Sequence, residues 1–471
     1  MLPLSRNILL LCLFSIPFIV NAQTNNIAVW LTNKDRSALF QQQTPLAFNV
    51  ANTGNTTVIV DDNKHFQTMD GFGFALTGGS AQHIIKMSAG ARNKLLHQLF
   101  DTTGSNIGIS YLRLSIGASD LNEKIFSYDD VAGDTSLSHF NLAADQTDVI
   151  PVMQEILKIN PQIKILGSPW SPPAWMKTNN DTRGGRLKPE YYHAYANYLV
   201  KYIEAMKQHG ITIDAVTVQN EPLHPGNNPS LLLVAPDEAD FIKYHLGPLF
   251  KAKNVNTKII IYDHNADRPD YPVSILNDAA AAKYIDGSGF HLYNGNIDAL
   301  TYVHDVHPDK NIYFTEQMVV QFNRNNENDD DMSKINIAWP VRSLIIDAPR
   351  NWSKNVLLWN LAADAEFKPY TDRGGCPVCQ GAVTIEQDSV SYNLAYYTAA
   401  HASKFVRPGA VRIASNVADE LSNVAYKTPN GRIVLIVANS SDTDQSFNIQ
   451  YHNKTATALL KAGSVATYTW K

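Results

Sequence analysis

The stretch Ala215–Pro222 reads AVTVQNEP and changes character part-way along. Its first half, AVTV, has the β-branched composition and the alternation of a β-strand. Its second half ends on Asn220, Glu221 and Pro222, and proline cannot continue a strand. We therefore expect a strand that stops with an amide and a carboxylate at its C-terminal end.

Seven more apolar runs of this kind lie along the middle of the chain. They begin at Met69, Ile109, Ile163, Lys258, Gly287, Ile312 and Asn355. Segments with helical spacing separate them, and in one of these the spaced residues are Tyr192, Tyr195, Leu199, Ile203 and Met206. Alternating strands and helices in this number are typical of a (β/α)8 barrel, also called a TIM barrel. A doubly wound open sheet is the alternative, but the early strand-to-helix turns carry neither G-x-G-x-x-G nor a P-loop.

Both ends of the chain consist of short strand-like segments with turn residues between them. Examples are TTVIVDD near the start and GRIVLIVANSS near the end. They predict a small β-sandwich that is built from both termini and lies beside the barrel. The expected domains are a leader over 1–22, sandwich strands over 23–65 and 405–471, and the barrel over 66–404.

The first 22 residues predict a cleaved signal peptide. Arg6 precedes an apolar stretch from Ile8 to Val20, and a small-residue pattern ends at Ala22. An uncleaved membrane anchor is the alternative, although the apolar stretch is shorter than the roughly 20 residues that a span needs. We therefore expect export to the periplasm or the extracellular space, without a stable membrane anchor.

The charge and composition narrow the class of ligand. A formal charge of -5 over 471 residues, with no basic stripe, gives no electrostatic footprint for nucleic acid or for an anionic membrane surface. A hydrophobic content of 44% suits a globular protein with one large core and a smaller second one. Small neutral ligands fit this composition better than charged polymers.

Two cysteines remain once the leader is removed, Cys376 and Cys379 in the segment GGCPVCQG. In an oxidising compartment this pair predicts a local disulfide or two free thiols, and a metal site would need further ligands that the segment lacks. The only charge run, NRNNENDDDMSK from Asn323, is most simply a solvated loop because its spacing matches no EF-hand.

Polar and aromatic side chains collect where the predicted strands end. In a barrel of this kind the C-terminal ends of the strands form one rim, and the pocket is built there. The residues at these ends are Arg113, Trp170, Asn220, Glu221, Asp263, His264, His291, Tyr293, Glu316, Trp359 and Asn360. A barrel with a purely structural role would not need this set at one rim.

Glu221 and Glu316 end the fourth and seventh predicted strands, which lie on facing walls of an eight-membered ring. Carboxyl groups roughly 5 Å apart around a sugar suit a retaining glycosidase, and a gap of roughly 6.5 to 9.5 Å suits an inverting one. Either glutamate alone is most simply a solvated surface group, but the barrel places both in one pocket. Arg113 is the natural partner to keep the nucleophilic carboxylate ionised.

The remaining residues of the rim suit a sugar ligand. Asn220 can hydrogen-bond a sugar 2-hydroxyl, a contact that strengthens in the transition state. His291 is either a substrate contact or a histidine that is satisfied within the rim. The aromatic residues that can offer apolar faces to pyranose rings are Trp170, Trp175, Tyr293 and Trp359.

Taken in order, these segments resemble glycoside hydrolase family 30, the family of glucosylceramidase and of bacterial and fungal endo-β-1,6-glucanases. The matching segments are QTMDGFGFALTGGSA, YLRLSIGASDL, LGSPWSPPAWMKTN, VTVQNEP, GFHLYNG, YFTEQM, LLWNLA and HASKFVRPGA, which together span nearly the whole mature chain. The resemblance implies a barrel with a side β-sandwich and a retaining double displacement without metal or cofactor. It also implies that Glu221 is the acid/base and Glu316 the nucleophile.

The same resemblance assigns the sugar contacts and shows one departure. It implies that Asn220 contacts the 2-hydroxyl with Arg113 as its supporting cation, and that Trp170 and Trp359 line the first sugar subsite. Glucosylceramidase-like members carry an aspartate for the distal hydroxyls of the terminal sugar where this chain has Gly78. This loss leaves room for a site that cleaves within a chain or for a different sugar.

The leading substrates are therefore β-1,6-glucan and glucosylceramide-like β-glucosides. Cleavage of β-xyloside, β-fucoside or β-galactan by the same scaffold is the alternative. A non-catalytic carbohydrate-binding protein is a rival from another class. It would keep the aromatic residues but has no need of both Glu221 and Glu316.

Overall fold

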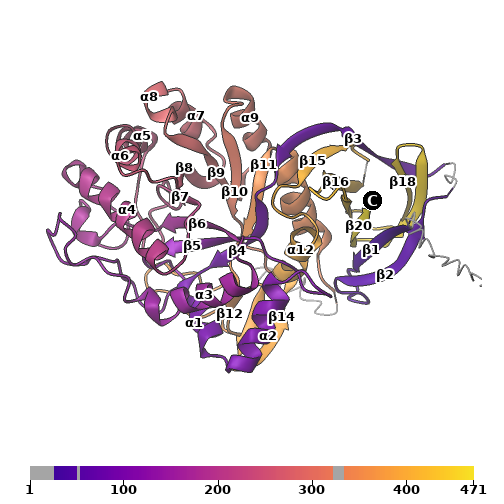
Figure 1. The fold of residues 1–471 in the computed structure, drawn as a ribbon, viewed down its shortest axis with the longest axis horizontal. Helices are drawn as coiled ribbons and strands as arrows, with labels where there is room; N and C mark the ends of the chain where they lie inside the picture. The colour runs from indigo at the N-terminus through magenta and orange to yellow at the C-terminus, as the bar shows by residue number, and fades with distance from the viewer. Residues whose placement is uncertain (1–25, 50–53, 322–333, 419) are drawn as a thin grey trace, which may run out of the picture.

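The computed structural model describes residues 26–49, 54–321, 334–418 and 420–471. In it a barrel ringed by helices lies beside a smaller sheet domain, and the long strand β3 (Thr56–Thr68) runs from one to the other (Figure 1). The two ends of the described chain meet in the smaller domain, where the strand from Asn26 pairs with the strand that ends at Trp470.

Eight parallel strands close the barrel. Around the ring they are β10 (Asn311–Glu316), β11 (Ser353–Leu358), β4 (Gly71–Leu76), β5 (Tyr111–Ile116), β6 (Lys164–Pro169), β7 (Ala215–Thr217), β8 (Lys258–Ala266) and β9 (Ile285–Gly295). Each coincides with one of the apolar runs, so the predicted barrel is confirmed and the open-sheet alternative is wrong. Inside the ring a packed layer is formed by Tyr111, Leu166, Ala215, Ile260, Tyr313 and Leu357. This layer closes the interior beneath the rim.

Helices cover the outer face of the barrel (Figure 1). The α-helices are α1 (Gly78–Lys86), α2 (Ala89–Phe100), α3 (Val149–Ile159), α4 (Tyr192–Gln208), α5 (Ala235–Phe241), α6 (Gly247–Ala252), α7 (Asp270–Leu276), α8 (Ala279–Ala282), α9 (Asp298–Val306), α10 (Ala338–Pro340), α11 (Asp347–Arg350) and α12 (Leu394–Ser403). Short 3-10 or π turns are η1 (Asp145–Thr147), η2 (Ala174–Met176), η3 (Pro189–Tyr191), η4 (Ile242–Leu246) and η5 (Val341–Ile346). Helix α4 buries the residues whose spacing predicted it, which confirms that helix.

The second domain is a nine-stranded sheet. Its strands, in spatial order, are β19 (Lys454–Leu460), β18 (Gln445–Tyr451), β3, β15 (Val411–Ser415), β16 (Leu421–Lys427), β17 (Ile433–Asn439), β20 (Val465–Trp470), β1 (Asn26–Thr32) and β2 (Gln41–Ala47). An antiparallel bridge between Asn49 and Thr455 joins the two edges, so the sheet wraps around a core of its own. The predicted β-sandwich from both termini is confirmed.

The barrel and the sandwich share buried side chains. Trp30 and Phe40 of the N-terminal segment belong to the same apolar core as the barrel, and Phe72 of β4 meets Tyr426 of β16 edge-on with ring centroids 6.5 Å apart. His401 of α12 lies between the hydroxyls of Thr32 and Thr467, at 2.8 and 2.9 Å. Burial lowers the pKa of His401 to about 3, so it is neutral and serves the interface.

A long loop leaves the barrel after β11 and returns through a small sheet. The sheet consists of β12 (Ala362–Ala363), β13 (Val383–Glu386) and β14 (Ser389–Tyr392). We call the loop between β12 and β13, residues 364–382, the strap. Cys376 and Cys379 lie on it and form a disulfide, which decides between the two thiol states that the sequence left open.

Two sequence predictions fall outside the described residues: the leader over 1–22, and nearly all of the acidic run from Asn323. Within the described ranges, each helix is too short or too polar to cross a bilayer.

Candidate active site

The turn after β7 presents Glu221 to the mouth of the barrel. The backbone N–H of Asn220 donates to Pro169 O at 2.8 Å, and that of Glu221 donates to Asp263 O at 3.0 Å. Glu221 itself has a φ of 44°, in the left-handed region that side chains other than glycine rarely adopt. Such a conformation costs on the order of 1–3 kcal/mol, and the surrounding hydrogen bonds hold it in place. The strand therefore ends here because the chain turns to aim one carboxylate inward.

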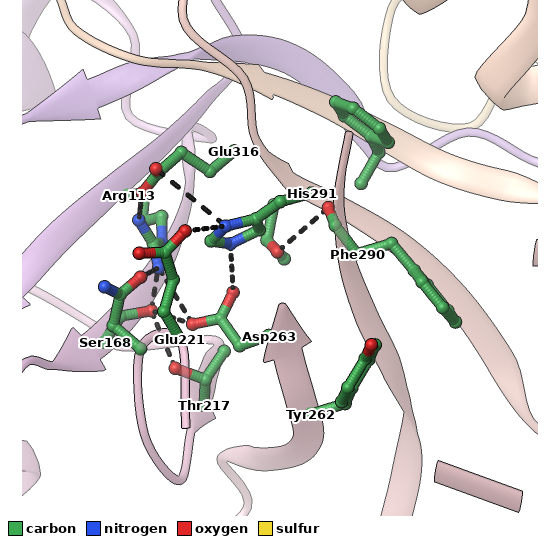
Figure 2. Close-up of polar contacts among 12 residues, drawn as sticks. Arg113, Ser168, Thr217, Glu221, Tyr262, Asp263, Phe290, His291 and Glu316 are labelled. Carbon is green, nitrogen blue, oxygen red and sulfur yellow. Dashed lines mark hydrogen bonds and ion pairs between the residues drawn. The ribbon is translucent and has the colours of Figure 1, made fainter. Parts of the chain in front are cut away.

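Arg113 of β5 organises the floor of the site (Figure 2). Its Nη1 donates to Glu316 Oε2 at 2.5 Å, and its Nη2 donates to Asn220 Oδ1 at 2.7 Å and to Asp263 Oδ2 at 2.8 Å. Its Nε donates to Ser168 Oγ at 3.0 Å. The side chain is fully buried, and its acceptors come from β6, from the turn after β7, from β8 and from β10. One planar guanidinium thus fixes the positions of both Glu316 and Asn220.

His291 of β9 lies among three carboxylates. Its Nε2 lies 3.1 Å from Asp263 Oδ1, and its Nδ1 lies 3.3 Å from Glu221 Oε1 and 3.9 Å from Glu316 Oε1 (Figure 2). Burial alone would lower the pKa of His291, but the charges of Glu316, Asp263 and Glu221 outweigh burial and raise it to about 9. His291 is therefore an imidazolium at neutral pH.

Asp263 connects the two cations, and sequence reasoning gave it no role. Burial acts to raise its pKa, but Arg113 and His291 outweigh burial and hold the pKa far below the usual range. It lies at an irregular point within β8, where Tyr262 and Asp263 have φ values of 74° and 51° and the pairing with β9 shifts register. The sequence could have indicated this role, because Asp263 follows an apolar run and the C-terminal ends of barrel strands form the rim.

The two glutamates lie close together. Oxygen atoms of Glu221 and Glu316 and a ring nitrogen of His291 lie within 4.8 Å of one another. Carboxyl oxygens this close fit the spacing of about 5–5.5 Å in retaining enzymes better than the gap of about 6.5–9.5 Å in inverting ones.

The same proximity couples the ionisation of the two glutamates. Burial raises the pKa of Glu316, and the charge of Glu221 adds to this effect, while His291 and Arg113 act against it. For Glu221 burial acts in the same direction, but the hydrogen bond and the charge of His291 outweigh it and lower the pKa. Two carboxyl groups this close titrate as a pair, and the pair can hold one proton.

A cavity of about 270 Å³ opens over the glutamates. Its wall contains six of the residues predicted from the sequence, namely Trp170, Asn220, Glu221, Tyr293, Glu316 and Trp359. The indole rings of Trp170 and Trp359 lie 5.4 Å apart, and Tyr293 donates its hydroxyl to Glu316 Oε1 at 3.0 Å. The remaining lining residues are Asp120, His224, Asn227, Asn265, Met318, Cys376 and Cys379.

Three residues from the sequence analysis, Arg113, Trp175 and His291, do not line the cavity. Arg113 was expected to support the nucleophile and Asn220, and His291 to be either a substrate contact or satisfied within the rim; both side chains are fully buried and bind carboxylates. Trp175 was expected to offer a stacking face, but its indole N–H donates to Asp129 O at 3.0 Å and its ring packs on Tyr191. Trp175 therefore supports the loop that carries Trp170.

Asp120 supplies a carboxyl group that the sequence reasoning missed. It lies in the loop after β5, lines the cavity, and is almost fully buried. Burial, with the charges of Glu316 and Glu221, raises its pKa to about 8. Position 78 has no space for a side chain, because a Cβ there would lie 2.0 Å from Asn122 Nδ2. Asn122 in turn accepts from Ser119 N at 2.8 Å and shapes the loop that carries Asp120.

Two groups of described residues bring potential metal ligands together. One is the set of Glu221, His291 and Glu316, where Arg113 already supplies positive charge. The other is a surface set of Asp129, Asp134 and His139, in which Asp134 accepts hydrogen bonds from Ser136 and Ser138. The geometry of the cavity itself is that of a carboxylate pair with sugar-sized space above it.

Two family models match the sequence. The glycosyl hydrolase family 30 TIM-barrel domain covers residues 69–406, and the glycosyl hydrolase family 30 beta sandwich domain covers residues 409–468. The chain belongs to glycosyl hydrolase family 30. It is therefore a retaining β-glycoside hydrolase, which agrees with the spacing of Glu221 and Glu316 and sets aside the non-catalytic binding protein.

Named members of family 30 align over most of their length. The endo-1,6-beta-D-glucanase neg1 of Aspergillus fumigatus is 33% identical over 428 residues, 84% of this chain and 84% of the relative. The lysosomal acid glucosylceramidase of Mus musculus is 29% identical over 434 residues, 87% of this chain and 82% of the relative. A solved structure of an endo-beta1,6-glucanase superposes with a TM-score of 0.87 at 32% identity, covering 94% of this chain and 99% of that one.

Proposed function

We propose that this family 30 enzyme cleaves β-1,6-glucan, with glucosylceramide-like β-glucosides as the second candidate. The observation that carries the catalytic part is the pair of buried carboxyl groups, Glu221 and Glu316, within 4.8 Å at the mouth of the barrel. The glucan is placed first because relatives named endo-1,6-beta-D-glucanase reach 35% identity, whereas relatives named glucosylceramidase reach 30%.

In the first step Glu316 acts as the nucleophile. Its carboxylate oxygen attacks the anomeric carbon of the sugar, and the bond from that carbon to the glycosidic oxygen breaks. Glu221 gives its proton to the departing oxygen, so the leaving group departs as a neutral alcohol and Glu221 becomes a carboxylate. The product of this step is a glycosyl ester on Glu316.

In the second step the direction of proton transfer is reversed. Glu221, now a carboxylate, takes a proton from a water molecule as the water oxygen attacks the anomeric carbon. The ester bond to Glu316 breaks, and the sugar leaves with the β configuration it began with. Both glutamates return to their starting states, so the cycle needs no further reactant.

The residues around the glutamates position them and the sugar. Arg113 and Tyr293 both donate to Glu316, at 2.5 and 3.0 Å, and these donors favour its carboxylate form. Asn220, held by Arg113, lies at the cavity wall and can meet the 2-hydroxyl of the sugar as the transition state forms. Asp120 presents a buried carboxyl group to the other hydroxyls of the ring, beside Trp170 and Trp359.

The pKa of Glu316 is raised and that of Glu221 is lowered. The two roles need the reverse, because the nucleophile must be ionised and the acid must carry a proton. One contact explains how the order can change. His291 Nδ1 lies 3.3 Å from Glu221 and 3.9 Å from Glu316, so its charge can favour either carboxylate after a small shift. A sugar bound over Glu221 excludes water from that group and favours its protonated form.

The substrate proposal is tested by product analysis. The purified protein is incubated with a β-1,6-glucan, with gentiooligosaccharides, with glucosylceramide and with aryl β-xylosides, β-fucosides and β-galactosides. Release of short β-1,6-linked oligosaccharides from the glucan supports the first candidate. Release of glucose alone from glucosylceramide, with the glucan untouched, would replace it with the second.

We also propose that the protein is exported. The apolar leader up to Ala22 and the disulfide on the strap both fit an oxidising compartment. N-terminal sequencing of protein recovered from the culture medium or the periplasm tests this, and a chain that still begins with the leader would contradict cleavage.

A further inference from the structure

The strap crosses the mouth of the barrel and is anchored at both sides. Near its start, His83 Nε2 lies 2.9 Å from Lys368 O, and Thr371 N donates to Asp120 O at 2.9 Å. Farther along, Asn228 Nδ2 donates to Asp372 O at 3.0 Å. These anchors come from α1, from the loop after β5 and from the loop after β7. The strap is therefore fixed across half of the rim.

Two further contacts press the strap onto the loops after β6 and β7. Arg373 Nη2 donates to Asp181 Oδ1 at 3.0 Å. A Cβ on Gly374, whose φ is +148°, would lie 2.5 Å from Gly226 O, so only glycine allows this approach. The disulfide follows directly after these contacts, at the point where the strap turns back toward β13.

The disulfide is part of the cavity wall. Cys376 and Cys379 both line the cavity, and Cys379 is 4% exposed and packs in one apolar cluster with Trp170 and Trp359. Sulfur is polarizable and a weak hydrogen-bond acceptor, so it suits contact with the C–H faces of a sugar and not with its hydroxyls. The catalytic carboxyl groups, in contrast, are held by Arg113, His291 and Tyr293, none of which lies on the strap.

We propose that the Cys376–Cys379 disulfide forms an apolar wall of the subsite that binds the reacting sugar, and that it sets the affinity for that sugar and not the rate of bond cleavage. This rests on the proposed glycosidase function of the same cavity. The covalent link fixes the two sulfurs relative to each other, and Cys379 packs in one apolar cluster with Trp170 and Trp359. Without the link the wall loses its fixed position, while the glutamates keep theirs.

The test is a double substitution, C376S with C379S, which removes the link and nearly preserves side-chain size. With an aryl β-glucoside, KM is expected to rise about tenfold while kcat changes less than about threefold, because uniform sugar binding is lost and transition-state contacts are kept. The inhibition constant of glucose as a competitive inhibitor should rise by the same factor. Glu366→Gln, an exposed change on the same strap, is the matched control and should alter neither constant.

A second measurement keeps the inference testable if the double variant does not fold. The wild-type protein is treated with a phosphine reductant, thiols are counted, and KM and kcat are measured before and after reduction with circular dichroism as a check on folding. An unchanged KM in folded, fully reduced enzyme would overturn the inference, and so would a loss confined to kcat. Failure of the wild-type enzyme to cleave any β-glucoside would instead overturn the proposed function, so the two failures are distinguishable.

Discussion

At the scale of single residues, Asp263 is the group on which both buried cations depend. It accepts from Arg113 at 2.8 Å and lies 3.1 Å from His291, and it is not itself among the residues that line the cavity. Removing its charge leaves two cations beside each other without their shared partner, which is costly in a buried site. Asp263 is thus a positioning residue for both halves of the site.

Asp263→Asn is expected to lower kcat by about 10²-fold, because a displaced Arg113 no longer holds Glu316 in its attacking position. It should also lower the pKa of His291, so the alkaline limb of the pH profile of kcat/KM should move to lower pH. Asp270→Asn, in an exposed ion pair with Arg268 on the same side of the barrel, is the matched control. An unshifted pH profile in folded Asp263→Asn enzyme would contradict this role.

At the scale of elements, the start of α1 shapes the loop that carries Asp120. A methyl group on Gly78 would meet Asn122 Nδ2 at 2.0 Å, so Gly78→Ala must displace the side chain that holds Ser119. We expect a loss of about 1–3 kcal/mol in the free energy of unfolding, typical of overpacking, together with a higher KM.

Gly90 in α2 is the matched site for this comparison. No atom lies within 4 Å of a Cβ at Gly90, so Gly90→Ala should stabilise the protein by about 0.5–1 kcal/mol through helix propensity. Urea unfolding of both variants measures the difference. Equal stability of the two would show that the loop accommodates the methyl group at position 78 without cost and would contradict the prediction.

The elements also show how far the sequence could be read. Glu221 and Glu316 were predictable because parallel strands of a barrel deliver their C-terminal residues to one rim. The inward aim of Asp263 depends on two consecutive left-handed residues, which no alternation of apolar and polar residues signals. Asp120 lies beyond the end of β5, in a loop whose course is set by Asn122 and by the strap. Contacts made across the rim by loops far apart in sequence had no local signal.

At the scale of the whole molecule, barrel and sandwich are expected to unfold together. Trp30 and Phe40 share one apolar core with the barrel, and His401 is held between threonines from the neighbouring sandwich strands β1 and β20. Calorimetry should therefore give one transition whose van't Hoff and calorimetric enthalpies agree. Two separate transitions would show that the shared core does not couple the domains.

The pH dependence of stability is a second property of the whole molecule. His291 has a folded pKa of about 9, above its unfolded value of 6.5, so its contribution is fully present below pH 6.5 and is lost as the pH rises toward 9. The difference in Tm between the wild type and His291→Gln should be largest at pH 6 and should shrink by pH 9.5. A difference that grows with pH would contradict a charged His291.

The central claim is that Glu316 is the nucleophile and Glu221 the acid/base, and rescue by azide tests it most directly. With an activated aryl β-glucoside, Glu316→Gly should lose at least about 10³-fold in kcat, and added azide should restore turnover with the α-glycosyl azide as product. Glu221→Gly should give the β-glycosyl azide, because azide then attacks the glycosyl ester on Glu316. The β product from Glu316→Gly, with the α product from Glu221→Gly, would exchange the two roles and contradict the account.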